Sequence, residues 1–220
     1  MHYTMFIASI GLEFAEKIAE LLCLFQNISK VFIPHKGECV EKMADRNVSL
    51  DIEALPKHFT VLINAGTSKK IYAYNVLDSV HRDVIFLALS HPAHNMIRTL
   101  DRLGVGTDKL EFIDAITKRI DSKTSVDGCE YLYSRDYNEV LKAIERKVQS
   151  KGIQDNVLFV DALHHLLLQD DSKTAMNFLD FFHKRLKVLR LNSIFLVDLE
   201  KLRPDVRRKI EAISDKTITL

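Results

Sequence analysis

The chain has 220 residues, 47% of them apolar, so it can bury a substantial core, and its length fits one α/β domain with additions. Its 31 Lys and Arg and 30 Asp and Glu give a formal net charge of +1, which excludes a field over the whole molecule that attracts nucleic acid or acidic lipid. Any such partner must therefore bind a local patch.

The cysteines Cys23, Cys39 and Cys129 are odd in number and include no CxxC pair. This pattern argues against both a disulfide framework and a zinc site, and it favours a reducing compartment. The apolar run at residues 5–25 is interrupted by four charged residues, and no small-residue cleavage site follows it. We therefore expect a cytoplasmic protein with no signal peptide and no association with a membrane.

Residues 1–58 are expected to form an N-terminal α/β extension or a small module ahead of a main domain at residues 59–220. Within the extension, residues 12–25 have the apolar spacing of a helix. The stripe consists of Phe14, Ile18, Leu21 and Phe25. It packs on the rest of the chain or pairs with a second chain, and the pattern leaves both open. A strand at residues 30–34, a helix at 38–46 and a connector at 51–58 complete the extension.

From residue 59 the chain alternates short apolar runs with helical patterns. The predicted strands cover residues 59–63, 84–89, 110–113, 157–160 and 193–197, with short additions at 131–133 and 216–220. The predicted helices cover residues 70–80, 92–103, 136–150, 174–191 and 204–213. Runs that are apolar on both faces indicate a three-layer α/β fold, in which helices flank a mostly parallel sheet. We expect residues 216–220 to form an edge strand and residues 117–130 to be mainly a loop.

Residues 60–70, TVLINAGTSKK, stand where a nucleotide-binding strand, loop and helix would begin this fold. A phosphate-binding loop of the form GxxxxGK[ST] uses glycines to turn backbone N–H groups toward phosphate. Its lysine reaches the β and γ oxygens, and its hydroxyl binds Mg²⁺. The two lysines of this segment, Lys69 and Lys70, allow two registers of the pattern.

Neither register keeps more than the lysine. If Lys69 is that residue, the glycine positions hold Ile63 and Ser68; if it is Lys70, they hold Asn64 and Lys69. The loop is therefore a degenerate Walker A motif. Phosphate contact through it would be weak and poor in metal.

Several phrases between residues 61 and 220 resemble the KaiC-like branch of the RecA superfamily of ATPases. Two of them carry the resemblance: FLALSHPAHNMIRTLDRLGVGTDKLEFIDAIT at residues 86–117 and VLFVDALHHLLLQDDSKTAMNFLDFFHKRLKVLRLNSIFLV at residues 157–197. The features shared with the family are at residues 89–92, 103–104, 113–114, 161 and 178–179. The resemblance implies a RecA-like P-loop NTPase fold and ATP as a possible ligand.

The resemblance also implies a vestigial nucleotide site, formed by Gly66, Ser68, Lys69, Lys70 and Asp161. In the family, Asp161 corresponds to the aspartate on the metal side. An aspartate after a buried strand also commonly caps the next helix, and both interpretations stay open. The two lysines could likewise contact a phosphate or remain solvated.

Where the family usually places a catalytic carboxylate, this chain has Ser90 and His91. A serine cannot act as that base. Phosphoryl transfer depends on positioning and on neutralised charge, so losing the loop, the metal hydroxyl and the carboxylate should remove nearly all turnover. We expect no ATPase activity and name no catalytic residue.

Two other residue groups have a structural and a functional interpretation. Asp114 is expected to cap the end of a strand. The histidines His91, His94, His164 and His165 lack a third ligand at helical spacing, so we predict no metal site.

Residues 183–209 contain nine Lys or Arg and three acids, a local charge of +6. This segment is either a patch for nucleic acid or an acidic partner, or a set of solvated helices. The residues that could contact nucleic acid are Lys184, Arg185, Lys187, Arg190, Arg207 and Arg208.

We favour a non-catalytic KaiC-like protein that acts as a regulatory or scaffolding partner, with a protein partner or a homo-oligomer as its assembly. An ATP-binding regulator with little or no hydrolysis is the alternative. A nucleic-acid-associated accessory factor is the second alternative.

Overall fold

The computed structural model describes residues 50–220, except residues 53, 121–123 and 152–155. The helix and strand predicted at residues 12–25 and 30–34, the helix at 38–46 and the apolar stripe all lie outside the described residues. Residues 51–58, in their described part, form turns and bends, as expected of a connector.

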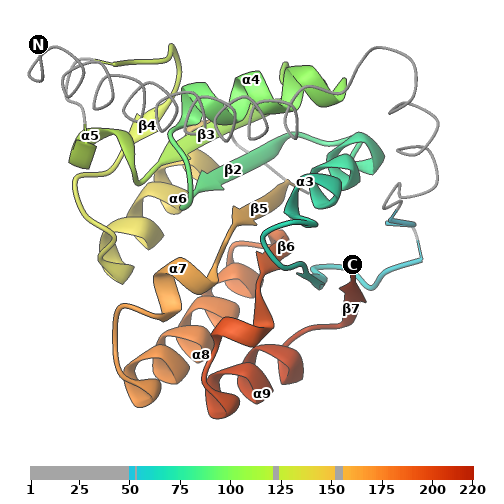
Figure 1. Ribbon diagram of the computed structural model, residues 1–220, viewed down its shortest axis with the longest axis vertical. Coiled ribbons are helices and arrows are strands. Elements are labelled where there is room, and N and C mark those ends of the chain that lie inside the picture. The colour runs from blue at the N-terminus through green and yellow to red at the C-terminus, as the bar shows by residue number, and fades with distance from the viewer. Residues whose placement is uncertain (1–49, 53, 121–123, 152–155) are drawn as a thin grey trace, which may run out of the picture. The chain divides into compact units, whose positions relative to one another are not determined.

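The described chain contains a sheet of seven parallel strands in the order β4-β3-β2-β5-β6-β1-β7 (Figure 1). Their bounds are β1 Thr60–Asn64, β2 Val84–Ala88, β3 Leu110–Asp114, β4 Glu130–Tyr131, β5 Val157–Asp161, β6 Asn192–Val197 and β7 Lys216–Thr219. β1 lies between the last two strands, with Leu62 paired to Phe195 on one side and Thr217 on the other. The short strands β4 and β7 form the two edges.

Helices cover both faces of this sheet (Figure 1). One face carries α3 Lys70–Ala73, the 3₁₀ helix η1 Tyr74–Ser79 and α4 Ala93–Leu103, and the other carries α6 Tyr137–Lys151, α8 Ser172–Val188 and α9 Pro204–Ala212. The shorter elements are α5 Thr117–Ile120, α7 His164–Leu167 and the 3₁₀ helix η2 Leu199–Lys201. The chain runs along the sheet from β1 to the edge strand β4 and then in the opposite direction from β5 to β7. Because each connection between parallel strands is right-handed, this reversal places the helices before β4 on one face and those after it on the other.

The strand residues alternate between two hydrophobic cores. In β1, Val61 and Ile63 join the core beneath η1 and α4, whereas Leu62 joins the core beneath α6, α8 and α9. All three side chains are fully buried. A strand buried on both faces has no polar alternation, which is why short, continuous apolar runs predicted the parallel sheet correctly.

The predicted fold class is confirmed, and five short elements correct the detail. The expected helix at residues 70–80 is instead the short helix α3 followed by η1. Helix α5 occupies part of the expected loop, and α7 and η2 were not predicted. Helices of one turn show no full apolar period, so periodicity cannot reveal them. Within the described residues, no helix has the length and apolarity needed to span a membrane.

Candidate functional site

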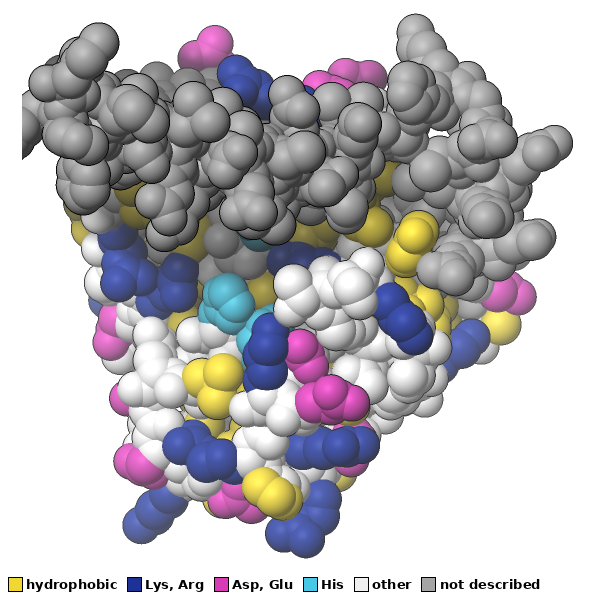
Figure 2. Space-filling view, in the orientation of Figure 1, with side chains coloured by type: hydrophobic (Ala, Val, Ile, Leu, Met, Phe, Trp, Pro, Cys, Tyr) yellow, Lys and Arg dark blue, Asp and Glu magenta, His cyan; other side chains and the backbone are white. Residues whose placement is uncertain are grey.

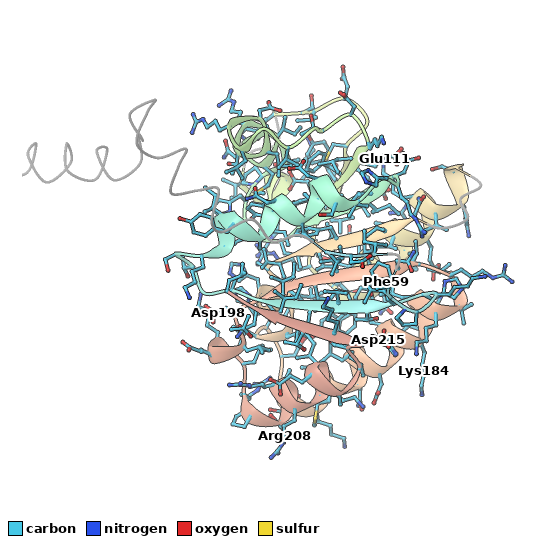
Figure 3. All side chains as sticks on the ribbon, turned by 90° about the vertical axis from the view of Figure 1, so that its right-hand side faces the viewer. Phe59, Glu111, Lys184, Asp198, Arg208 and Asp215 are labelled. Carbon is cyan, nitrogen blue, oxygen red and sulfur yellow. The ribbon has the colours of Figure 1, made fainter. Side chains whose placement is uncertain are left out.

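The candidate site lies at the carboxyl edge of the sheet, where the loops after β1, β2, β5 and β6 meet. In parallel α/β sheets, this is the edge at which ligands usually bind. Figure 3 shows both ends of the strands: Phe59 and Glu111 lie toward their amino-terminal ends, and Asp198 lies at the opposite, carboxyl edge of the sheet. Figure 2 looks onto the carboxyl edge, where histidine, basic and acidic side chains gather.

Asp161, the last residue of β5, is the centre of the site and is fully buried. The Lys70 ammonium lies 2.7 Å from Oδ1 of its carboxylate, and the Tyr74 hydroxyl donates to the same oxygen at 2.9 Å. The Ser90 hydroxyl donates to Oδ2. Both carboxylate oxygens are therefore occupied by groups of the protein itself.

Ser90 joins this cluster to the surface. Its hydroxyl oxygen lies 2.5 Å from the Lys70 ammonium and 2.8 Å from Nδ1 of His91. A hydroxyl has one proton to donate and two lone pairs. Because Ser90 donates to Asp161, it accepts from Lys70, and its contact with His91 requires the proton on Nδ1. The hydroxyl is then fully hydrogen-bonded and is not an activated nucleophile.

Tyr74 is a buried member of the site that our sequence analysis did not identify. Burial raises the pKa of its hydroxyl far above the ordinary range, and the negative charge of Asp161 raises that pKa further. The hydroxyl therefore stays protonated and remains a donor. Tyr74 follows Lys70 by four residues, which places both side chains on one side of the α3–η1 segment. The Lys70 ammonium lies 5.8 Å from the centroid of the Tyr74 ring. That four-residue spacing was the only local indication that Tyr74 accompanies Lys70. It points to a site only once β5, which carries Asp161, is known to lie beneath this segment.

The loop at residues 65–69 is closed on itself and tied to η2. The carbonyl of Gly66 accepts from the backbone N–H groups of Lys69 and Lys70, at 3.0 and 3.1 Å. None of the five loop residues has a positive φ, so Gly66 does not use the freedom that distinguishes it from other residues. Lys201 contacts Thr67 at 3.2 Å, which holds the loop against η2.

The structure separates the five predicted site residues into two groups. Lys70 and Asp161 form the buried ion pair, and Gly66 closes the turn that precedes it. Ser68 and Lys69 are exposed to solvent. Of the two lysines considered, the one that contacts Asp161 is thus Lys70, and its charge is balanced by that carboxylate.

The two strand-end aspartates differ from each other in role. The interpretation of Asp161 as a helix cap is wrong, because α7 has no side-chain cap and Asp161 faces Lys70 instead. Ala162, directly after it, has a φ of +57°, a conformation that residues with a side chain rarely adopt. The interpretation of Asp114 as a cap is correct: its carboxylate accepts from the backbone N–H groups of Ile116 and Thr117, at 2.7 and 2.8 Å.

A buried histidine supports the neighbouring loop after β6. Nδ1 of His164 accepts from the backbone N–H of Asp198 at 3.2 Å, which fixes the ring proton on Nε2. Burial, and then the neighbouring His165, lower the pKa of His164 to about 4. The ring is therefore neutral near pH 7. On the other side of the loop, Lys201 is ion-paired with Asp198 at 3.1 Å.

These residues do not fit ATP and Mg²⁺ in the way that the fold implies. A phosphate-binding loop presents several N–H groups to one anion, whereas here two of them bond to Gly66. The carboxylate that would assist a metal already has three partners. Within residues 50–220 as described, no group of three or more His, Cys, Asp or Glu is placed to hold a metal ion.

Comparison with known proteins identifies the fold. No family model and no curated protein matches the chain. Among solved structures, the chain is similar to a KaiC-like protein from the hyperthermophilic archaeon Pyrococcus horikoshii, with a TM-score of 0.53 and 16% identity, covering 76% of this chain and 72% of that one. It is also similar to an uncharacterized protein from the same archaeon in complex with an unknown peptide, with a TM-score of 0.58 and 15% identity, covering 77% and 80% of the two chains.

The parallel sheet and these neighbours show that the chain has a RecA-like α/β fold. More particularly, its fold is KaiC-like, as the phrases at residues 86–117 and 157–197 predicted. Identities of 15–16% establish the fold alone.

Proposed function

We propose that this chain belongs to the KaiC-like branch and uses its fold as a non-hydrolysing scaffold or regulatory partner. The observation that carries the proposal is the ion pair between Lys70 and the buried carboxylate of Asp161, 2.7 Å apart. A nucleotide would have to take Lys70 from Asp161, and it would leave a buried charge unpaired. Such a loss costs about 3–5 kcal/mol.

The chemistry around this pair also opposes hydrolysis. An attacking water needs a positioned base, and the position of the family's carboxylate holds Ser90, whose hydroxyl is already fully hydrogen-bonded. Because the carboxylate of Asp161 is fully occupied, a metal would have to displace Tyr74 or Ser90. The proposal therefore requires no cofactor.

A scaffold acts through a partner. A protein of the same fold was solved in complex with an unknown peptide, so this fold is compatible with peptide binding. We extend the proposal to a cytoplasmic protein that binds a protein partner or a further copy of itself, with residues 1–58 as an N-terminal extension or small module beside the domain at 59–220.

A titration with ATP and Mg²⁺ tests the proposal. A ligand at a hundred times its Kd adds about 2.7 kcal/mol to the free energy of unfolding, which a thermal melt detects readily. We expect no shift in melting temperature and no phosphate release above that of a heat-inactivated sample. A shift without phosphate release would instead support the ATP-binding regulator.

A matched pair of variants identifies the residue responsible for any shift. If ATP binds at the candidate site, Lys70→Met should abolish the shift and Lys69→Met should preserve it. Phosphate release that is lost in Asp161→Asn would overturn the proposal of a non-hydrolysing protein.

A further inference from the structure

The outer side of α8 carries an apolar and basic stripe that is not part of the candidate site around Asp161. Phe181 and Val188 are 57% and 69% exposed, and Lys184 lies between them on the same side of the helix. Their spacings of three, four and seven residues align them over two helical turns, about 10 Å. We name Phe181, Lys184 and Val188 the α8 stripe.

The helices on both sides of α8 are tied to it by ion pairs. Arg185 of α8 is paired with Glu145 of α6, and Lys209 of α9 is paired with Asp180 of α8, both at 2.5 Å. These cations are therefore balanced by acids within the helical layer. Arg207 is balanced in the same way by Glu211, at 3.2 Å.

Three cations in or beside the α8 stripe have no acidic partner among the described residues. Lys184, Lys187 and Arg190 are exposed, and none of them forms an ion pair with a residue in the described part of the chain. The helical layer thus presents paired charge at its flanks and net positive charge along the C-terminal half of α8. Figure 3 shows Lys184 on the outer side of the helices, and Arg208 apart from it on α9.

The end of α8 supplies a second, independent observation. Arg190 has a φ of +56° just after the helix, at a position that usually holds glycine. Residues held in a strained backbone conformation often have a functional side chain. Here that side chain adds a cation near Val188.

We infer that the α8 stripe is the docking surface for an acidic amphipathic helix of a protein partner. A partner helix with apolar residues at i, i+3 or i+4, and i+7 can pack on Phe181 and Val188, which are two turns apart. Glutamates or aspartates beside that apolar face would pair with Lys184, Lys187 and Arg190. The inference rests on the proposed scaffolding role and specifies its partner.

The same observations oppose a nucleic acid as the occupant. A phosphodiester backbone gains nothing from Phe181 and Val188. If it ran across the layer, it would also meet the carboxylates of Glu145, Asp180 and Glu211, whose paired cations it could use only by breaking those pairs. A short acidic helix confined to the α8 stripe avoids all three.

The experiment uses the full chain and a fluorescein-labelled synthetic peptide of about 18 residues, with leucine at helical spacing and glutamate on the flanks. Fluorescence anisotropy measures its Kd, and a scrambled peptide of the same composition is the control. We expect a Kd on the order of 10–100 μM and no binding of the scrambled peptide. Phe181→Ser and Lys184→Glu should each weaken binding at least about fivefold, while Arg208→Glu should leave it unchanged.

Three results would overturn the inference. The first is the absence of binding, or equal binding of the scrambled peptide. The second is an equal loss of affinity in Lys184→Glu and Arg208→Glu. The third is tighter binding of a labelled single-stranded RNA or of phosphatidylserine vesicles, weakened by the same variants. Because Phe181 is exposed, its replacement should leave the melting temperature unchanged, which confirms that the variant is folded.

The ATP titration on the same protein separates this inference from the proposed function. If the peptide binds and ATP also raises the melting temperature, the α8 stripe is supported as a docking surface, and the proposal of a scaffold that binds no nucleotide is contradicted. No peptide binding and no ATP shift would overturn the α8 stripe alone.

Discussion

Asp114 at the end of β3 accepts a hydrogen bond from the backbone N–H of Ala93, the first residue of α4, at 2.6 Å. α4 has Pro92 at its N-cap position and no cap from its own side chains. Asp114 therefore caps α4 from the neighbouring strand, while it also accepts from the turn that follows β3. At the other end, α4 stops at Gly104, whose φ of +77° favours glycine.

Removing this carboxylate should be among the most destabilising single changes to the fold. Asp114→Ala leaves three backbone N–H groups and the Thr117 hydroxyl without an acceptor, all in the buried interior. Since a buried unsatisfied donor costs about 1–3 kcal/mol, we expect a loss of at least about 3 kcal/mol in urea unfolding. Asp171→Ala, which removes an exposed N-cap, is the control and should cost about 1 kcal/mol. Equal losses in the two variants would contradict the buried cap.

The buried ion pair predicts strong coupling in a double-mutant cycle. Lys70→Met leaves the Asp161 carboxylate buried without a cation, and the expected loss in the free energy of unfolding is about 3 kcal/mol. Asp161→Asn should rescue part of that loss in the double variant, with a coupling energy of at least about 1 kcal/mol. Lys69→Met, at an exposed lysine, should change stability by less than about 0.5 kcal/mol. Strict additivity would show that the pair does not form.

His164 should make stability fall in mild acid. Its pKa is about 4 in the folded protein, against an ordinary value of 6.5. Between these values, the unfolded chain binds a proton that the folded chain does not. The contribution of the neutral His164 to the free energy of unfolding is therefore fully present above pH 6.5 and is lost as the pH falls toward 4. The expected loss is roughly 2–3 kcal/mol.

His164→Asn tests this dependence, because an amide oxygen can accept from the Asp198 N–H but cannot titrate. Urea unfolding at a series of pH values should give a difference between the native protein and His164→Asn that changes sharply between pH 4 and 6.5. Parallel stability curves would assign the acid sensitivity to other groups.

Replacing Arg190 should separate stability from binding. Glycine accepts the positive φ at this position without strain, so Arg190→Gly should raise the free energy of unfolding by about 0.5–1 kcal/mol. The same change removes a cation beside the α8 stripe and should weaken binding of the acidic peptide. Arg208→Gly, within α9, should instead destabilise by about 1 kcal/mol and leave binding unaltered. A destabilised Arg190→Gly variant would show that the arginine supports the native fold.

The sheet could be predicted because its signal lies in local composition. Residues 84–88, VIFLA, are apolar throughout, and only a strand covered on both faces buries such a run in so few residues. The strand order could not be read in this way, since β1 pairs with β6 and β7, more than a hundred residues further along the chain.

The candidate site was only partly predictable for the same physical reason. The family resemblance and the degenerate loop made Lys70 and Asp161 candidates, but their mutual contact depends on how β5 passes beneath α3. Nothing in the sequence marks Tyr74 as a site residue, because its hydroxyl gains a role only from its hydrogen bond to the Asp161 carboxylate. Distant pairings of buried polar groups leave no periodic trace in a sequence.

The position of β1 also constrains the order in which a growing polypeptide can acquire its structure. Thr60 exchanges hydrogen bonds with Asp215, 155 residues later, and the other neighbour of β1 begins at Asn192. During vectorial synthesis, β1 must therefore wait with both of its edges open while most of the domain is translated. Chaperones that shield nascent chains should be needed most in that interval, and stalled translation before residue 192 should yield an aggregation-prone product.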